Sequence, residues 1–178
     1  MTIFTIGHST HPIDEFIAIL QTYDIKQLVD IRTIPRSGHN PQYEQTALQK
    51  SLPVAGIDYV YMKNLGGLRP KVSGSINTGW RNLSFRNYAD YMQTAEFRNA
   101  IEGLISIARQ KPTAIMCAEA VPWRCHRSLV GDALVVRAVT VKDIISKTKL
   151  SLHTVTSFAK TDGITLTYPA DTIGIKRE

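Results

Sequence analysis

Short apolar segments alternate with longer amphipathic segments along most of the chain. The apolar segments are typical of buried strands and predict them at residues 2–6, 27–31, 57–62, 114–117 and 140–145. The amphipathic segments predict one helix that begins at Pro12 and further helices over residues 41–52, 85–92, 95–108 and 124–136. The clearest stripe has apolar residues three or four positions apart, at Phe97, Ala100, Ile101, Leu104, Ile105 and Ala108.

This alternation of strand and helix predicts a single α/β domain over residues 1–178. Strands that are apolar throughout indicate a mainly parallel sheet with helices on both faces. About five strands are too few for an eight-stranded barrel, so we expect an open sheet. Residues 150–178 lack the pattern and are expected to form a tail packed on the domain, extended around residues 164–168.

Residues 63–83 interrupt the alternation. Gly66-Gly67, Pro70 and Ser73-Gly74 fall in this stretch, and such residues are typical of loops. A loop of this length inside a domain is uncommon and is often functional. We therefore expect a functional loop before the helix at residues 85–92.

Polar and basic side chains follow four of the predicted strands. In open α/β sheets, ligands bind outside the carboxyl ends of the strands, which meet at one edge. The convergence of these residues on that edge is the main functional signal of the sequence. They are His8 and Ser9 after the first strand, Arg32, Arg36 and Ser37 after the second, Lys63 and Asn64 after the third, and Cys117 and Glu119 after the fourth.

Residues 114–127 hold the densest group of reactive side chains. A predicted strand ends at Cys117, and the helix predicted from Arg124 has Cys125, His126 and Arg127 in its first turns. A helix N-terminus favours anions and, with arginines nearby, lowers the pKa of a thiol. Helical geometry points His126 toward the sheet edge, so we expect it to interact with Cys117. The alternative is a buried histidine bonded to a backbone carbonyl, beside a cysteine that fills the core.

Two thiols with His8 or His126 are also a donor set that zinc accepts. However, the spacing of Cys117 from Cys125-His126 matches no standard zinc motif, and neighbouring residues on a helix rarely chelate one ion. The sequence therefore predicts no metal and no other cofactor.

Composition and charge narrow the class of protein. The chain has 178 residues, 43% hydrophobic and 20% charged, which is typical of globular proteins. It contains no apolar run of membrane-spanning length and no signal peptide, and two cysteines do not make a disulfide framework. We therefore expect a cytoplasmic protein with no membrane partner. The net charge of +6 favours anionic partners.

A second interpretation rests on a window without acidic residues between Asp58 and Asp90. Basic groups contact phosphates and aromatic rings stack on bases, so this window favours a nucleic acid as the alternative partner. The competing interpretation places the aromatic residues in the core and the cations on a solvated loop. The window contains the cations Lys63, Arg69, Lys71, Arg81 and Arg86 and the aromatic residues Tyr59, Tyr61, Trp80, Phe85 and Tyr88.

The motifs, taken in order, resemble the domain-of-unknown-function 488 family over nearly the whole chain. The resemblance rests on Thr5-Ile6-Gly7-His8-Ser9, Asp30-Ile31-Arg32, Gly56-Ile57-Asp58-Tyr59, Leu65-Gly66-Gly67, Tyr88-Ala89-Asp90-Tyr91-Met92 and Met116-Cys117-Ala118-Glu119 through Cys125-His126-Arg127. It implies no established reaction. The family motifs fall on residues already selected above: His8, Ser9, Arg32, Cys117, Glu119, Cys125, His126 and Arg127.

These observations lead to three hypotheses. The first is a site for a phosphate- or nucleotide-type anion, in a hydrolase or transferase with Cys117 as nucleophile and His126, Glu119 or His8 as acid–base groups. The second is a non-catalytic nucleic-acid-binding module that serves DNA repair or RNA processing. The third is a redox-responsive protein that uses Cys117 and Cys125. The residues expected to bind the anion are Ser9, Arg32, Arg36, Ser37, Gly67, Arg69, Arg124, Cys125 and Arg127.

Overall fold

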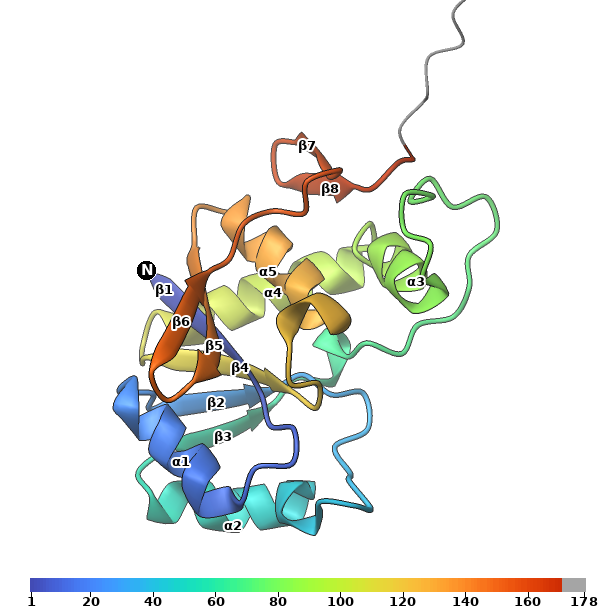
Figure 1. The fold of residues 1–178 in the computed structure, drawn as a ribbon. Coiled ribbons are helices and arrows are strands. Elements are labelled where there is room, and N and C mark those ends of the chain that lie inside the picture. Colours follow the sequence, from blue (N-terminus) through green and yellow to red (C-terminus); the bar gives the residue numbers. More distant parts are fainter. Residues whose placement is uncertain (171–178) are drawn as a thin grey trace, which may run out of the picture.

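A six-stranded sheet forms the centre of the molecule in the computed structural model, which describes residues 1–170 (Figure 1). Its strands lie in the order β3-β2-β4-β1-β5-β6, and only β6 pairs antiparallel. A separate hairpin, β7-β8, follows. The bounds are β1 Thr2–Gly7, β2 Gln27–Asp30, β3 Asp58–Tyr61, β4 Thr113–Cys117, β5 Thr140–Ser146, β6 Lys149–Leu152, β7 Lys160–Asp162 and β8 Thr165–Thr167. The predicted mainly parallel α/β fold is confirmed, with β6 as an additional strand.

Two of the helices begin later than the sequence predicts. The helix predicted from residue 41 is a 3-10 turn followed by α2, because Glu44 between them is extended. The helix predicted from Arg124 begins at Arg127, because Cys125 is extended. The helices are α1 Ile13–Thr22, α2 Gln45–Val54, α3 Leu83–Tyr91, α4 Ala95–Ala108 and α5 Arg127–Val135, with 3-10 turns η1 Pro41–Tyr43, η2 Lys63–Leu65 and η3 Pro122–Arg124. None of the helices within residues 1–170 combines the length and apolar character needed to cross a membrane.

The sheet separates two hydrophobic clusters. Alternate residues of β4 belong to different clusters, as a strand buried on both faces requires: Ile115 packs with α4 and α5, and Met116 packs with α1 and α2. Figure 1 shows α1 and α2 on one side of the sheet and α4 and α5 on the other. The layers therefore run helix, sheet, helix.

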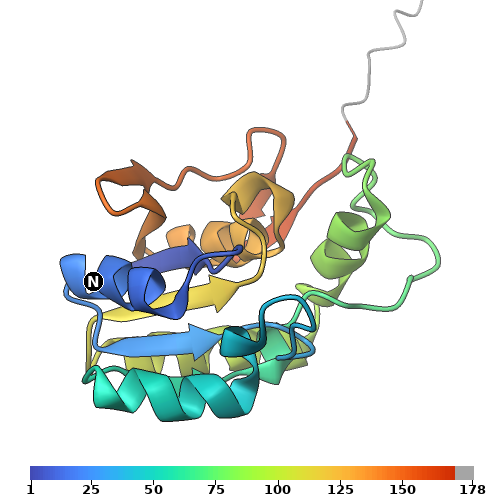
Figure 2. The ribbon, with the colours of Figure 1, turned by 60° about the horizontal axis from the view of Figure 1, so that its bottom comes forward.

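Neighbouring strands β1 and β4 send their connections to opposite faces of the sheet. The chain leaves β1 for α1, whose Phe16 belongs to one cluster, and leaves β4 for α5, whose Leu129 belongs to the other. A crevice opens at the carboxyl ends where two such connections diverge. Figure 2 shows the arrows of β1, β2 and β4 pointing to the same side. That edge is where a ligand site is expected.

The predicted loop before α3 is confirmed over residues 66–82, which contain no helix or strand. The Asp90 carboxylate accepts hydrogen bonds from Ser75 and Asn77 in this loop. The loop also binds the tail, because Tyr168 donates its backbone N–H to Asn77 at 2.8 Å. The tail has strand β8 within the stretch predicted to be extended, and its Leu166 and Tyr168 are buried. The last part of the predicted tail, residues 171–178, lies outside the described residues.

Candidate functional site

A cavity of about 360 Å³ lies at the carboxyl ends of β2 and β4. Most of the sequence-predicted site residues line it: Arg32, Arg36, Gly67, Cys117, Glu119, Arg124, Cys125 and His126. The remaining predicted residues are not on its wall: His8, Ser9, Ser37, Arg69 and Arg127. Residues after four strands were predicted to converge at this edge of the sheet. The loops after three of them, β2, β3 and β4, contribute residues to the wall of the cavity.

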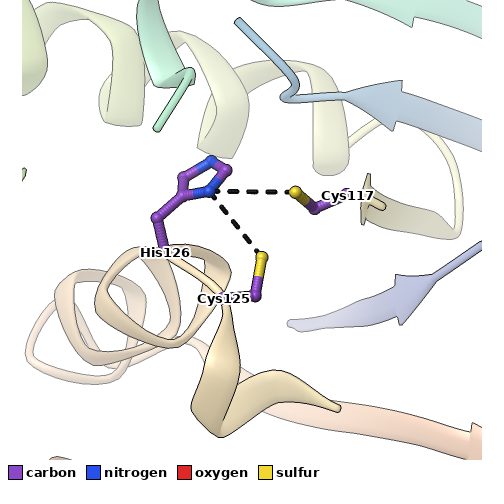
Figure 3. Close-up of side chains that lie close together, drawn as sticks. All are labelled: Cys117, Cys125 and His126. Atoms are coloured by element: carbon purple, nitrogen blue, oxygen red, sulfur yellow. Dashed lines mark hydrogen bonds between the residues drawn. The ribbon is translucent and has the colours of Figure 1, made fainter. Parts of the chain in front are cut away.

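Cys117, Cys125 and His126 meet on the wall of the cavity (Figure 3). The His126 Nδ1 atom lies 3.8 Å from the Cys117 Sγ atom and 3.7 Å from the Cys125 Sγ atom. All three donor atoms lie within 4.8 Å of one another. The predicted approach of His126 to Cys117 is confirmed, and so is the carbonyl contact of the alternative interpretation, because Nε2 lies 3.1 Å from the Ile31 oxygen.

The carbonyl contact determines which nitrogen of the ring carries the proton. A carbonyl oxygen only accepts hydrogen bonds, so Nε2 is protonated and donates to Ile31. In the neutral imidazole, Nδ1 then has a lone pair directed at the two sulfur atoms. This nitrogen can accept a proton from a thiol or coordinate a cation.

The local backbone explains why neighbouring residues reach the same point. Strand β4 ends at Cys117, the turn η3 follows, and Cys125 is extended with φ −132° and ψ 143°. His126 is the N-cap of α5 and has helical backbone angles, so Cys125 and His126 are not stacked on one helix. One of the two grounds for predicting no metal from the sequence, that Cys125 and His126 lie on one helix, is therefore wrong.

The two thiols differ in their expected ionisation. The Cys117 thiol, acting as a hydrogen-bond donor, lowers the pKa of Cys125 to about 7, burial opposes this shift, and the Arg127 charge assists it. The same interaction with Cys125, together with burial, raises the pKa of Cys117. These opposite shifts make Cys125 the more readily ionised thiol of the pair. The sequence predicts Cys125 as an anion contact or as a redox partner of Cys117, and not as the more acidic thiol.

Arg127 positions the loop after β4 rather than lining the cavity. Its guanidinium is 1% exposed and donates hydrogen bonds to the backbone oxygens of Glu119 and Ala120. Its backbone N–H lies 3.5 Å from the Cys125 Sγ atom and donates to it. Gly7 permits the same loop to lie close to β1, since a Cβ at that position would lie 1.7 Å from the Glu119 oxygen.

Arg32 lies at the wall, but most of its donors are already occupied. Its Nε and Nη2 atoms donate to the two oxygens of buried Asp30, at 2.9 and 2.6 Å, and Nη2 also donates to the Tyr43 oxygen. Its Nη1 atom lies 3.4 Å from the His8 Nε2 atom. Tyr59 completes the group by donating to Asp30. The charge of Arg32 is therefore balanced by Asp30 below the cavity.

His8 lies behind Arg32 and is neutral near pH 7. Burial lowers its pKa to about 4, and the Arg32 charge contributes in the same direction. Its Nδ1 atom lies 2.8 Å from the Ser9 backbone oxygen, and its ring stacks on Tyr43 with centroids 4.1 Å apart. In this arrangement His8 supports the Arg32 side chain, and Ser9 contributes a backbone acceptor.

Arg36 and Arg124 are the cations of the wall without assigned partners. Both are exposed, and neither forms a side-chain hydrogen bond or ion pair with any of the described residues. Glu119, also exposed, lies on the same wall. Because Arg32 is neutralised, Arg36 and Arg124 give the cavity its positive charge.

Arg69 and Ser37 shape the loops that surround the cavity. The Arg69 guanidinium lies 3.4 Å above the Tyr91 ring and donates to the Gly66 and Asn64 oxygens, which fixes the backbone beside Gly67. Ser37 accepts a hydrogen bond from the backbone N–H of Asn40 within its own loop. These two predicted anion contacts therefore point to backbone partners rather than into the cavity.

The family model described as "Domain of unknown function DUF488" matches residues 12–134, which is more than half of the chain. The chain belongs to this family. The resemblance expected from the motifs is thus confirmed, and all residues that line the cavity fall inside the matched range. No curated protein and no solved structure matches the chain. The DUF488 description assigns no reaction, so the function has to be argued from the site.

Sequence reasoning missed several wall residues of this DUF488 chain. They include the apolar Ile34 and Leu68, which are 57% and 66% exposed although they lie beside arginines. An exposed large apolar residue in a loop, next to cations, is a signal that could have identified them. The other missed wall residues are Thr33, Ser84, Phe85 and Ala118.

The aromatic residues of the acid-free window pack inside the DUF488 fold. Phe85 and Tyr88 are buried, and Trp80 packs against Phe85 with ring centroids 4.8 Å apart. Tyr59 and Tyr61 donate hydrogen bonds to Asp30 and to the Thr33 oxygen. The interpretation that placed them in the core therefore fits better than base stacking. Nucleic-acid binding stays a prediction that rests on exposed cations, which are Lys63, Lys71 and Arg81.

Proposed function

We propose that this DUF488 protein binds a nucleotide-type anion in the cavity and carries out hydrolysis or group transfer on it. The observation that carries the proposal is a pair of arginines, Arg36 and Arg124, that have no partner within residues 1–170 and lie on a wall that also holds Cys117, Cys125 and His126. The cavity size supports a small molecule, since ligand pockets measure about 300–1,000 Å³.

The arginine pair favours a phosphate group over a carboxylate of similar charge. A guanidinium presents a planar fork of N–H donors, and a phosphate has enough oxygens to accept from two such forks. Arg36 comes from the loop after β2 and Arg124 from the turn η3, so the two cations reach the cavity from different loops. An anion bound between them would connect these loops.

The apolar part of the wall favours an anion with a large uncharged portion. Ile34 and Leu68 are exposed next to the arginines, and Phe85 lies on the same wall. An inorganic ion would leave these side chains in water, whereas a nucleoside would cover them and gain from their burial. A nucleoside phosphate therefore fits the cavity better than phosphate alone.

The cluster of Cys117, Cys125 and His126 supplies the reactive groups. The Nδ1 lone pair faces both sulfur atoms, and His126 is held by its hydrogen bond to Ile31. A base in contact with a thiol is the arrangement that nucleophilic catalysis uses. Glu119, exposed on the same wall, is the carboxylate available for proton transfer to solvent.

Isothermal titration calorimetry tests the anion site, with adenosine monophosphate and inorganic phosphate as probes. We expect tighter binding of the nucleotide than of phosphate. Loss of one charged hydrogen-bond donor costs about 1.5–3 kcal/mol, so Arg36→Ala and Arg124→Ala should each weaken nucleotide binding about tenfold or more. The salt-dependent part of the binding enthalpy should also become smaller in these two variants.

The matched control for this titration is Arg109→Ala. Arg109 is an exposed arginine at the end of α4, immediately before β4, so it lies toward the amino edge of the sheet. Its replacement should leave the affinity unchanged. Equal effects of Arg109→Ala and Arg124→Ala, or no nucleotide binding by the wild-type protein, would contradict the proposed site.

A further inference from the structure

We infer that Cys117, Cys125 and His126 bind zinc, with a fourth coordination position open to the cavity. Two thiolates and one imidazole are a donor set that zinc accepts, and catalytic zinc sites use three protein ligands with one open position. Soft sulfur donors exclude magnesium and calcium as the preferred ion.

The distances between the donor atoms fit a tetrahedral ion. Zinc bonds of about 2.3 Å to sulfur and about 2.05 Å to nitrogen, at tetrahedral angles, separate S and N by about 3.6 Å. The observed separations from Nδ1 are 3.8 Å to Cys117 and 3.7 Å to Cys125. The two S···N separations therefore already match a bound ion, and the two sulfur atoms, which lie within 4.8 Å of each other, would settle at about 3.8 Å around it.

Two hydrogen bonds behind the donors match what a metal centre needs. His126 donates from Nε2 to the Ile31 oxygen, which leaves Nδ1 as the coordinating nitrogen. The backbone N–H of Arg127 donates to the Cys125 sulfur atom at 3.5 Å, which would stabilise a bound thiolate. Both supports exist without an ion, so the ligands are already oriented.

Gly67 lets its loop lie directly against the His126 ring. A Cβ at this position would lie 2.5 Å from Nδ1 and 2.8 Å from Cγ, so a side chain there would displace the imidazole from its present position. All three donor residues and Gly67 line the cavity. The cluster therefore borders the space where the anion is proposed to bind, which leaves room there for a fourth ligand.

The metal site stands on this geometry alone, and its role rests on the proposed function. With zinc bound, Cys117 and Cys125 are ligands rather than nucleophiles. The open position then holds a water molecule or an oxygen of the nucleotide phosphate, which places the reaction class as metal-assisted hydrolysis or transfer. A thiol nucleophile, which the sequence predicts and the proposed function uses, then applies only to the cluster without metal.

The test is titration of the full chain with Co²⁺ after reduction of the thiols and removal of metal with a chelator. We expect one Co²⁺ per chain, with a thiolate-to-cobalt charge-transfer band in the ultraviolet and visible bands of tetrahedral intensity. Zn²⁺ should displace the cobalt and erase both features. The inference is overturned if the reduced chain develops no thiolate-to-cobalt band, or if Zn²⁺ does not displace the bound cobalt.

Substitution of single residues of the cluster tests which side chains bind the metal. His126→Gln and Cys125→Ser should each weaken metal binding more than about 100-fold, since even an outer hydrogen bond is worth about 10–100-fold. His39→Gln, an exposed histidine outside the cluster, is the matched control and should bind as tightly as the wild type. Equal affinity of His126→Gln and His39→Gln overturns the assignment.

Gly67→Ala keeps all three donors and tests whether the present position of the His126 ring is needed for metal binding. We expect weaker Co²⁺ binding and a changed visible spectrum, because the added methyl group displaces the imidazole. Gly38→Ala is its control, since a Cβ there contacts nothing within 4 Å. This variant remains informative if the donor variants fail to fold, and an unaltered spectrum would overturn the assignment of His126 as a ligand.

The metal and anion sites can fail separately. Cobalt uptake is measured without any anion, and nucleotide binding to the chelator-treated chain reports the arginine pair alone. Nucleotide binding without cobalt uptake overturns the zinc site and leaves the anion site. Cobalt uptake without nucleotide binding supports the zinc site and overturns the anion site.

Discussion

Single residues decide how closely the loop after β4 approaches its neighbours. Gly7 ends β1 under the Glu119 oxygen, and Gly67 lies against the His126 ring. Any side chain at either position would occupy space that a backbone carbonyl or an imidazole already fills. Both glycines are therefore explained by close approach and not by an unusual backbone angle.

Replacement of Gly7 by alanine should strongly destabilise the protein. The new Cβ would lie 1.7 Å from the Glu119 backbone oxygen, and backbone cannot move aside as a flexible side chain does. We expect the free energy of unfolding to fall by about 2–4 kcal/mol, measured by urea denaturation. Gly38→Ala should change it by less than about 0.5 kcal/mol. Equal stability of the two variants would refute the close approach.

The sequence was sufficient to predict the pairing of Cys117 with His126 but not the position of Cys125. A strand end and a helix start bring the first two together, and periodicity indicates both. The third contact depends on the extended backbone of Cys125, which breaks the helical pattern assumed there. Pro122, three residues earlier, is the sequence signal for a separate turn before α5.

At the scale of elements, a buried charged group joins α5 to β5 and the tail. The His153 ring lies between two carboxylates, with Nε2 2.9 Å from Asp132 and Nδ1 3.1 Å from Asp143. Both nitrogens face acceptors, so the ring carries two protons and a positive charge. Tyr168 also donates to Asp132, and Thr5 donates to Asp143. The imidazolium and its two carboxylate partners therefore connect α5, β5, β1 and the tail.

The charge on His153 predicts how stability depends on pH. Burial lowers its pKa, but the hydrogen bonds and charges of Asp132 and Asp143 outweigh this and raise the pKa to about 9. Because the folded value exceeds the ordinary 6.5, the stabilisation is complete below pH 6.5 and is lost as the pH rises through about 9.

Urea unfolding of the wild type and of His153→Gln across this pH range measures the effect. The difference in the free energy of unfolding between the two proteins should shrink by up to about 3 kcal/mol as the pH rises from below 6.5 to above 9. The glutamine variant cancels contributions from other titrating groups. A difference that stays constant with pH would mean that His153 is neutral in the folded protein.

At the scale of the whole molecule, the alternating pattern was enough to predict the fold class and the edge that carries the site. Parallel strands joined by helices bring their carboxyl ends to one edge whatever the strand order. The order itself, with β4 between β2 and β1, depends on long-range packing that periodicity does not record. The extra strand β6 was missed because its four residues are all exposed.

The same limit explains why some predicted site residues do not line the cavity. Sequence reasoning could assign Arg32 and Arg127 to the edge, but only the fold shows that Asp30 neutralises the first and that backbone oxygens bind the second. Charge in a sequence does not distinguish a cation that binds a ligand from one that holds a loop. The exposed pair Arg36 and Arg124 is the one that we propose for ligand binding instead.

The central claim is that one cavity joins the arginine pair to the Cys117–Cys125–His126 cluster. A crystal structure of the full chain grown with adenosine monophosphate tests it most directly. The account predicts phosphate density between the Arg36 and Arg124 guanidinium groups, with the nucleoside over Ile34 and Leu68. Nucleotide bound elsewhere, with only solvent between these arginines, would contradict it.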